Sequence, residues 1–146
     1  MKKQMTLIMS AIALTIGLGM SNAAFAGGST VSIEQYGYAN GAAGGQKGKK
    51  NRLTIYQNGH GNVAISNQRG NKNRAVIGQN GSHNGANVYQ NGAGNIVGVG
   101  QFGSGHKVIT SQDGSGNAIG VIQAGRNQNA NVTQVGAGNV TVIVQD

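Results

Sequence analysis

The stretch Gln57-Asn58-Gly59-His60-Gly61-Asn62-Val63-Ala64-Ile65-Ser66-Asn67-Gln68 contains one full period of a repeat that runs through most of this chain. A glutamine opens the period, a glycine follows it by two residues and an asparagine by five, and the next glutamine comes eleven residues on. The glutamine recurs in unbroken register at Gln35, Gln46, Gln57, Gln68, Gln79, Gln90, Gln101, Gln112, Gln123, Gln134 and Gln145. A fixed period of this kind is the signature of a solenoid, in which each repeat stacks on its neighbours.

Two more columns of residues share the period. Two residues after each of the first ten glutamines the sequence has Gly37, Gly48, Gly59, Gly70, Gly81, Gly92, Gly103, Gly114, Gly125 and Gly136. Five residues after the glutamine it has Asn40, Asn51, Asn62, Asn73, Asn84, Asn95, Asn117 and Asn139. The two exceptions in this last column, His106 and Gln128, also carry hydrogen-bonding side chains. We expect inward glutamines and asparagines to bond to their copies in the repeats above and below.

The residues around each glutamine predict the local structure. Apolar or small residues four and two positions before it, as in Leu53-x-Ile55-x-Gln57, are typical of a strand with one buried face. The Gly-x-x-Asn after it predicts a turn, because glycine reaches positive φ without steric penalty and asparagine tolerates turn geometry.

A period of 22 residues lies beneath the period of eleven. Alternate units carry a branched residue two positions before the glutamine, at Ile33, Ile55, Ile77, Val99, Val121 and Ile143. The intervening units carry slimmer residues there on the whole: Gly44, Ser66, Val88, Thr110 and Val132. The predicted fold is therefore all-β, a β-solenoid of about five 22-residue strand-turn-strand coils. Its two facing parallel sheets become cross-β amyloid on assembly.

The N-terminal segment differs from the repeats. Two lysines and an apolar stretch precede Ala24-Phe25-Ala26, which is typical of a secretory signal peptide cleaved between Ala26 and Gly27. The apolar run is short for a membrane span, and the chain is not expected to be an integral membrane protein. The expected organisation is a signal peptide over residues 1–26, a short leader over 27–30, and eleven 11-residue units over 31–146.

Composition narrows the class of protein. Eleven basic residues against three acidic ones give a net charge of +8, and the chain has no cysteine and no proline. An exported chain without cysteine does not rely on a disulfide framework, and the absence of proline leaves strand pairing uninterrupted. The basic cluster of Lys47, Lys49, Lys50 and Arg52 is either a solvated turn or a contact for anionic surface polymers such as lipopolysaccharide or extracellular DNA.

The pattern Gln-x-Gly-x-x-Asn-x-Ala-x-x-x-Gln, present from Gln57 to Gln68 and in the two following units, resembles the curlin repeat. The resemblance covers nearly all of the chain after the signal peptide. It implies a subunit of curli, the functional amyloid fibres of bacterial biofilms, which are assembled outside the cell. It also implies partners: other copies of the chain, the other curli subunit, an outer-membrane secretion pore and periplasmic accessory factors. Anionic matrix polymers or host matrix proteins are further expected partners.

The family has a major fibre-forming subunit and a minor nucleator that anchors the fibre to the cell. The sequence stops one residue after the last glutamine, at Asp146, and in this it resembles the major subunit, which we favour. The basic charge and the near absence of a glycine-rich leader are more usual for the nucleator. Growth is expected to proceed head to tail, since the first and last strands of a solenoid offer unpaired backbone groups to one another.

The remaining motifs have simpler explanations. Gly98-Val99-Gly100-Gln101-Phe102-Gly103 matches the dinucleotide fingerprint, but no amphipathic helix follows it. His60, His83 and His106 are expected to be surface turn residues, without a nearby carboxylate or cysteine to complete a metal site. We therefore predict no enzyme activity, no catalytic residues, no metal and no cofactor. A monomeric solenoid adhesin or ligand-binding module is the alternative from another class of protein.

Overall fold

The computed structural model describes residues 27–146, so the expected signal peptide and Ala26 lie outside the described residues. The described chain consists of eleven strands, and all but the last contain nine residues. The strands are β1 (Thr30–Tyr38), β2 (Gly41–Lys49), β3 (Arg52–His60), β4 (Val63–Asn71), β5 (Arg74–Ser82), β6 (Gly85–Ala93), β7 (Ile96–Ser104), β8 (Lys107–Ser115), β9 (Ala118–Arg126), β10 (Asn129–Ala137) and β11 (Val140–Gln145).

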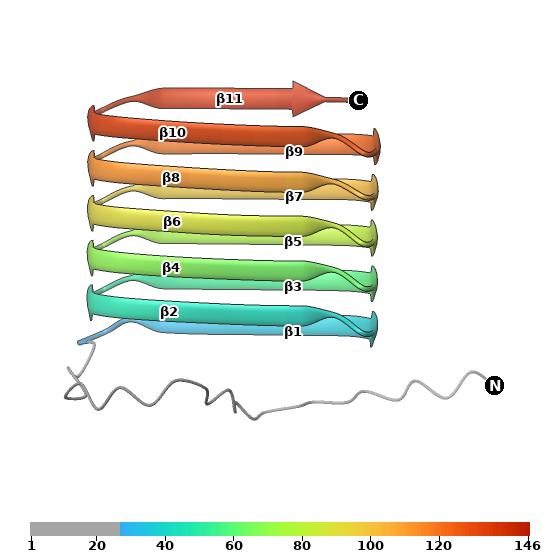
Figure 1. Ribbon diagram of the computed structural model, residues 1–146. Coiled ribbons are helices and arrows are strands. Elements are labelled where there is room, and N and C mark those ends of the chain that lie inside the picture. The colour runs from blue at the N-terminus through green and yellow to red at the C-terminus, as the bar shows by residue number, and fades with distance from the viewer. Residues whose placement is uncertain (1–26) are drawn as a thin grey trace.

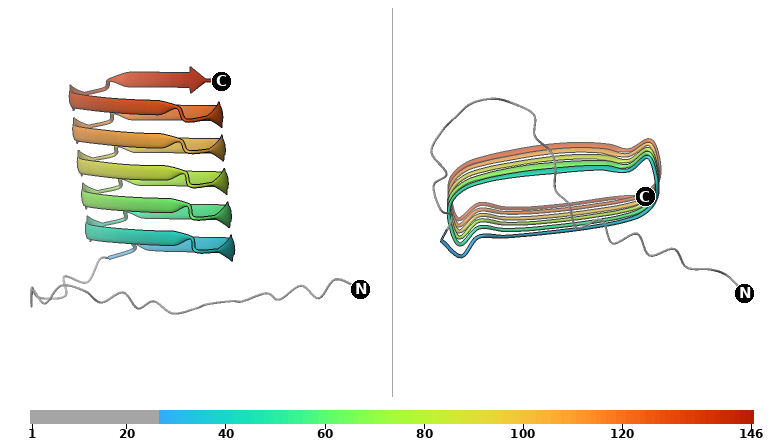
Figure 2. Two further views of the ribbon diagram at one scale, coloured as in Figure 1. Left: turned by 45° about the vertical axis from the view of Figure 1, so that its right-hand side comes forward. Right: turned by 90° about the horizontal axis from the view of Figure 1, so that it is seen from below.

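The strands form two parallel sheets that face each other across a flat core (Figure 1). One sheet has six strands in the order β1-β3-β5-β7-β9-β11, and the other has five in the order β10-β8-β6-β4-β2. Each strand pairs with the strand one coil further on, with equivalent residues side by side, as in Gln57 beside Gln79. Seen along the stack, the coils superpose as one flattened loop (Figure 2). The prediction of a two-sheet β-solenoid with 22-residue coils is thus confirmed.

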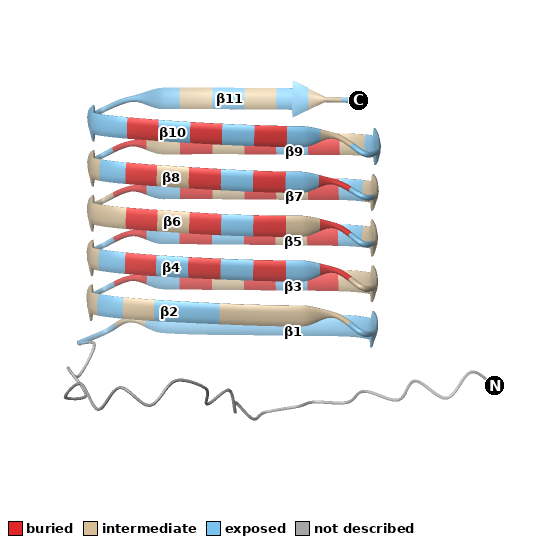
Figure 3. Cartoon of the chain, viewed as in Figure 1, coloured by how far each residue is buried: buried red, intermediate tan, exposed pale blue. Residues whose placement is uncertain are grey.

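The core follows the alternation of residues along each strand. In β3, for example, Leu53, Ile55 and Gln57 are fully buried, while the residues between them are partly or fully exposed. The same alternation recurs on every strand from β3 to β10 (Figure 3). Because successive side chains of a strand point to opposite faces, one apolar stripe per strand is enough to build this thin core.

Short arcs of two residues connect the sheets. We call the arcs that follow odd-numbered strands arc A, at residues 39–40, 61–62, 83–84, 105–106 and 127–128. Those that follow even-numbered strands form arc B, at residues 50–51, 72–73, 94–95, 116–117 and 138–139. The predicted turn glycines lie inside the strands, just before these arcs, at φ values from 96° to 126°. The chain therefore bends at these glycines and turns two residues later.

Residues 27–29 continue the pattern of arc B below the first coil, and Thr30, expected in the leader, already begins β1. The amide of Lys50 donates a hydrogen bond to the carbonyl of Gly27 (3.1 Å), and the amide of Asn51 donates to Ser29 Oγ (3.0 Å). Gly28 has φ of 74°, close to the 57° of Lys50 above it. The segment expected to be a leader thus takes the place of a preceding arc.

Candidate functional site

The glutamine column forms two continuous hydrogen-bonded ladders, one in each sheet. Gln57 Nε2 donates to Gln79 Oε1 (2.7 Å), and Gln79 Nε2 donates to Gln101 Oε1 (2.8 Å). Each glutamine from Gln35 to Gln123 donates to the glutamine 22 residues later over 2.6–3.0 Å. Gln57 Nε2 also donates to the carbonyl of Gly41, the first residue of β2 in the opposite sheet (3.0 Å). Amides buried in this way are satisfied only as members of a stack.

The asparagine column forms a second set of ladders at the arcs. The amide of Asn73 donates to Asn51 Oδ1 (3.0 Å), and Asn73 Nδ2 donates to the carbonyl of Gly92 in the coil above (3.0 Å). The same pair of bonds recurs at most members of the column. The asparagines thereby satisfy backbone groups that the arcs would otherwise leave without partners.

His106 corrects one expectation from the sequence. It is not a surface turn residue, because its side chain is only 1% exposed and takes the buried asparagine position of its arc. Its amide donates to Asn84 Oδ1 (3.1 Å), and its ring Nδ1 accepts from the amide of Gln128 (3.3 Å). The physical reason is its place five residues after Gln101, which points inward whatever residue occupies it. His60, also expected in a surface turn, is instead the last residue of β3 and is partly buried. His83 lies exposed on arc A, and the ring centroids of the two histidines are 5.1 Å apart.

The glycine column is the closest approach between coils. A Cβ on Gly81 would collide with the carbonyl oxygen of Gly103 in the next coil, and the same collision recurs at every glycine of the column except the last two, Gly125 and Gly136. A second column of positive φ, from 55° to 74°, recurs every eleven residues from Gly28 to Gly138. Sequence reasoning missed this second column, because Ala39, Lys50, Lys72, His83 and Asn127 share it with glycines. The glycine or asparagine at most of its positions was the signal available.

The two ends of the stack are open. Val31 and Ile33 of β1 face the core, yet they are 51% and 42% exposed, whereas their equivalents Leu53 and Ile55 in the next coil are fully buried. All nine residues of β1 are exposed, and β11 is exposed or intermediate throughout (Figure 3). Strand edges of this kind carry a row of unpaired N–H and C=O groups, which makes them templates for another strand.

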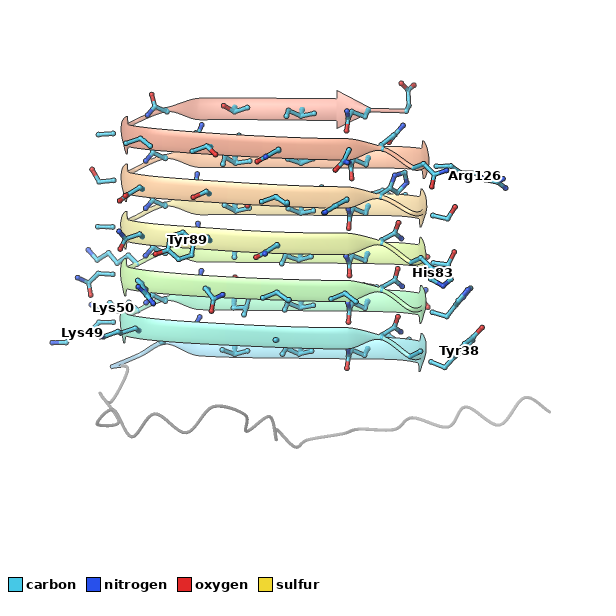
Figure 4. All side chains as sticks on the ribbon, in the orientation of Figure 1. Tyr38, Lys49, Lys50, His83, Tyr89 and Arg126 are labelled. Atoms are coloured by element: carbon cyan, nitrogen blue, oxygen red, sulfur yellow. The ribbon has the colours of Figure 1, made fainter. Side chains whose placement is uncertain are left out.

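Seven of the basic residues gather along arc B in the first three coils, at the N-terminal end of the stack. We call this cluster the basic corner: Lys47, Lys49, Lys50, Arg52, Arg69, Lys72 and Arg74. Lys49 and Lys50 extend outward from this edge, while Tyr38, His83 and Arg126 lie at the opposite edge (Figure 4). Like charges lie side by side in neighbouring strands, with Lys47 beside Arg69 and Arg52 beside Arg74. The positive field is therefore concentrated at one edge of the molecule.

Other kinds of site have little support. Among residues 27–146 no group of three or more histidine, cysteine, aspartate or glutamate side chains could hold a metal ion. The same part of the chain contains no helix long and apolar enough to cross a membrane. The dinucleotide-like glycines Gly98 and Gly100 lie on the outer face of β7.

Comparison with known families gives one match. A family model described as the curlin associated repeat matches residues 28–59, 50–81 and 67–90. The three matched segments overlap and together cover β1 to β5 and most of β6. No curated protein matches the chain.

Proposed function

Since this chain belongs to the curlin family, we propose that it is a structural subunit of curli, the secreted amyloid-type fibres of that family. The subunits stack head to tail, and the finished fibre mediates biofilm formation and adhesion to surfaces. The role is structural rather than enzymatic.

The observation that carries this proposal is the open, core-facing edge at each end of the solenoid. Half-exposed Val31 and Ile33 on the first strand occupy positions at which the next coils bury apolar residues completely. A second copy placed on this edge extends both sheets and covers the apolar stripe. Such a contact joins two different surfaces and does not close, so it generates a filament rather than a ring.

The route out of the cell is part of the proposal. Residues 1–26 direct export and are removed before Gly27. The chain then crosses the periplasm with accessory factors, leaves through the curli outer-membrane pore, and joins the extracellular fibre at the cell surface. Removing Lys2 and Lys3 with this segment leaves a chain that is still strongly basic.

The minor nucleator is a second candidate, favoured by the basic corner. Its stacked lysines and arginines lie beside the N-terminal edge, where they suit contact with an anionic surface polymer such as lipopolysaccharide or DNA. A nucleator bound in this way would present its far edge for growth. We favour the major subunit, because both edges are open in the same repeat register.

Thioflavin T fluorescence of the chain from Gly27 onward, diluted from denaturant, tests the proposal. Half of the samples receive sonicated fibres of the same chain, and a non-repeat protein of equal charge serves as the control. We expect a lag that the seeds abolish, together with a cross-β diffraction pattern, because a preformed edge removes the cost of nucleation.

Two other outcomes of this experiment would favour the alternatives. Growth without any lag would favour the nucleator over the major subunit. A soluble monomer that never binds the dye would overturn the proposal in favour of a monomeric solenoid adhesin.

A further inference from the structure

The backbone repeats every half coil, although the apolar core side chains differ between alternate strands. Both columns of positive φ recur every eleven residues, through both sheets alike. Arc A and arc B carry the same asparagine bonds, as Asn62 and Asn73 illustrate. One strand and its arc are therefore converted into the next by a half turn about the stack axis. As a result, the six-stranded and five-stranded sheets offer an incoming chain the same backbone template.

The ladders have a direction, and their ends are complementary. Every ladder glutamine donates toward the C-terminal end of the stack. Gln134 and Gln145 lie on the last strand of each sheet, so their Nε2 groups have no glutamine above them to donate to. Gln134 Nε2 donates instead to Thr141 Oγ1 (3.0 Å). Gln145 Nε2 keeps only the bond to the carbonyl 16 residues earlier that the other ladder glutamines also make, here at Asn129 (3.3 Å). At the other end, Gln35 and Gln46 are each bonded to the glutamine above through Nε2, which leaves Oε1 facing away from the stack. One end is thus ready to donate and the other to accept.

Two head-to-tail registers satisfy this polarity. Because the described solenoid has eleven strands, β10 and β11 both form its upper edge, half a coil apart. If β1 of the incoming chain stacks on β11, each sheet continues as itself, but a gap one strand long remains above β10. If β1 stacks on β10, then β2 stacks on β11, no gap remains, and the sheets exchange roles at the junction.

Resting on the proposed head-to-tail stacking, we infer that subunits join in the sheet-exchanged register. The six-stranded sheet of one subunit continues as the five-stranded sheet of the next, and successive subunits are related by a half turn. Eleven strands at half of the roughly 4.8 Å strand spacing give a rise of about 26 Å per subunit. An unfilled strand position would instead leave buried backbone groups without partners, which costs free energy at each of them.

Side chains at this junction meet suitable partners. In the exchanged register Gln35 of the incoming subunit stacks on Gln134. Ile33 and Val132 each lie two residues before these glutamines, so Ile33 stacks on Val132. Asn139 Nδ2, which now donates to the carbonyl of Val135, comes into register with the carbonyl of the incoming Gly37. These are the contacts that each coil makes with the next inside one subunit.

Charge complementarity points to the same register. Lys47 of the incoming subunit follows Gln46 by one residue, and Asp146 follows Gln145 by one, so stacking Gln46 on Gln145 places Lys47 beside Asp146. Both residues are exposed in the single subunit. In the register with a gap, the strand position below Lys47 is empty. The exchanged register therefore pairs one of the few acidic residues with a lysine of the basic corner.

Engineered cysteines distinguish the two registers, because the natural chain has no cysteine. Glu34 faces outward on β1. It stacks beside Thr133 in the exchanged register and beside Val144 in the other. Neighbouring strands bring the Cα atoms within disulfide range, whereas β1 is far from β10 and β11 inside one subunit (Figure 1). Fibres of Glu34→Cys/Thr133→Cys and of Glu34→Cys/Val144→Cys are oxidised, dissolved in denaturant and separated on a non-reducing gel.

We expect a ladder of covalent oligomers from the 34/133 pair and only monomers from the 34/144 pair. A ladder from the 34/144 pair would overturn the exchanged register. So would the absence of a ladder from both pairs in fibres that bind the dye. Failure of the unsubstituted chain to form any fibre would instead refute the proposed function. If a cysteine pair prevents assembly, fibres of Ser115→Cys carrying gold particles give the answer, because the label then alternates between the two edges of the fibre only in the exchanged register.

Discussion

Thr110 shows how a single buried hydroxyl limits the stability of the solenoid. It is 1% exposed, and its Oγ1 has no hydrogen-bond partner among the described residues. Its neighbours in the same column of the sheet are Val88 and Val132. We predict that Thr110→Val raises the free energy of unfolding by about 1 kcal/mol, because the unpaired hydroxyl is replaced by a methyl group of similar shape.

The urea midpoint followed by circular dichroism measures this gain. Thr133→Val, an exposed change of the same kind on β10, is the matched control and should leave the midpoint unchanged. A lower midpoint for Thr110→Val would mean that the hydroxyl has a partner, such as a buried water.

Two glycines with positive φ should respond very differently to substitution. Gly81 has φ of 126° and would place a Cβ against the Gly103 carbonyl, whereas Gly94 has φ of 67° with nothing within 4 Å. We predict that Gly81→Ala costs at least about 2 kcal/mol of stability, from backbone strain together with the clash.

Gly94→Asn should change the free energy of unfolding, measured by the same urea titration, by less than about 0.5 kcal/mol, because Lys72 already adopts this conformation one coil below. Equal losses at the two glycines would show that φ alone, and not the close approach of the coils, determines the cost.

At the residue scale the sequence predicted the positions of the repeating residues better than their surroundings. The glutamine register could be read directly, because a buried amide that must bond above and below recurs without exception. His106 was misplaced, because its residue type was given more weight than its position five residues after Gln101. The second positive-φ column was missed, since a lysine or histidine can occupy it at a small energetic cost.

At the scale of elements, the weak strand β2 depends on its neighbour β3. Gly44 offers no side chain to the core, and a Cβ there would collide with Leu53 Cδ2, which fills the space. Leu53 is larger than both of its neighbours in the same column of the six-stranded sheet, Val31 one coil earlier and Ala75 one coil later. The large side chain of Leu53 in one sheet therefore fills the space that Gly44 leaves empty in the other.

A double-mutant cycle measures this compensation. Leu53→Ala alone should cost about 3 kcal/mol, because it leaves a cavity, and Gly44→Val alone should also destabilise by overpacking. The double variant should recover at least about 1 kcal/mol of the summed loss, as expected for residues that share one space. Additive losses in the urea midpoints would mean that the two side chains do not share it.

Strand existence and pairing were predictable, but the length of the strands was not. The sequence predicted that each strand would end before the glycine, yet β3 continues through Gly59 to His60. The reason is that the glycine bends the chain without breaking the ladder, so pairing continues beyond it, with Gly59 still in register with Gly81. Propensity alone cannot separate a bend inside a strand from a turn that ends one.

At the scale of the whole molecule, charge is distributed unevenly along the stack. The basic corner lies at the N-terminal end, and Asp146 lies at the C-terminal end. In the sheet-exchanged register each junction brings Lys47 beside Asp146, and the other lysines of the corner are close enough to add to the attraction. These two charges should therefore affect the rate of fibre elongation more than they affect the stability of the monomer.

We predict that Lys47→Glu and Asp146→Lys each slow seeded elongation about two- to fivefold, since an exposed ion pair contributes roughly 0.5–1 kcal/mol and a like-charge pair opposes docking. The double variant Lys47→Glu/Asp146→Lys should restore the rate, because it rebuilds the pair with the charges reversed. Lys107→Glu, the same change on β8, which lies inside its sheet between β6 and β10, should have little effect. All differences should shrink in 1 M salt, where screening acts over about 3 Å. If the double variant elongates no faster than either single variant, Lys47 and Asp146 do not meet at the junction, and the register that brings them together is wrong.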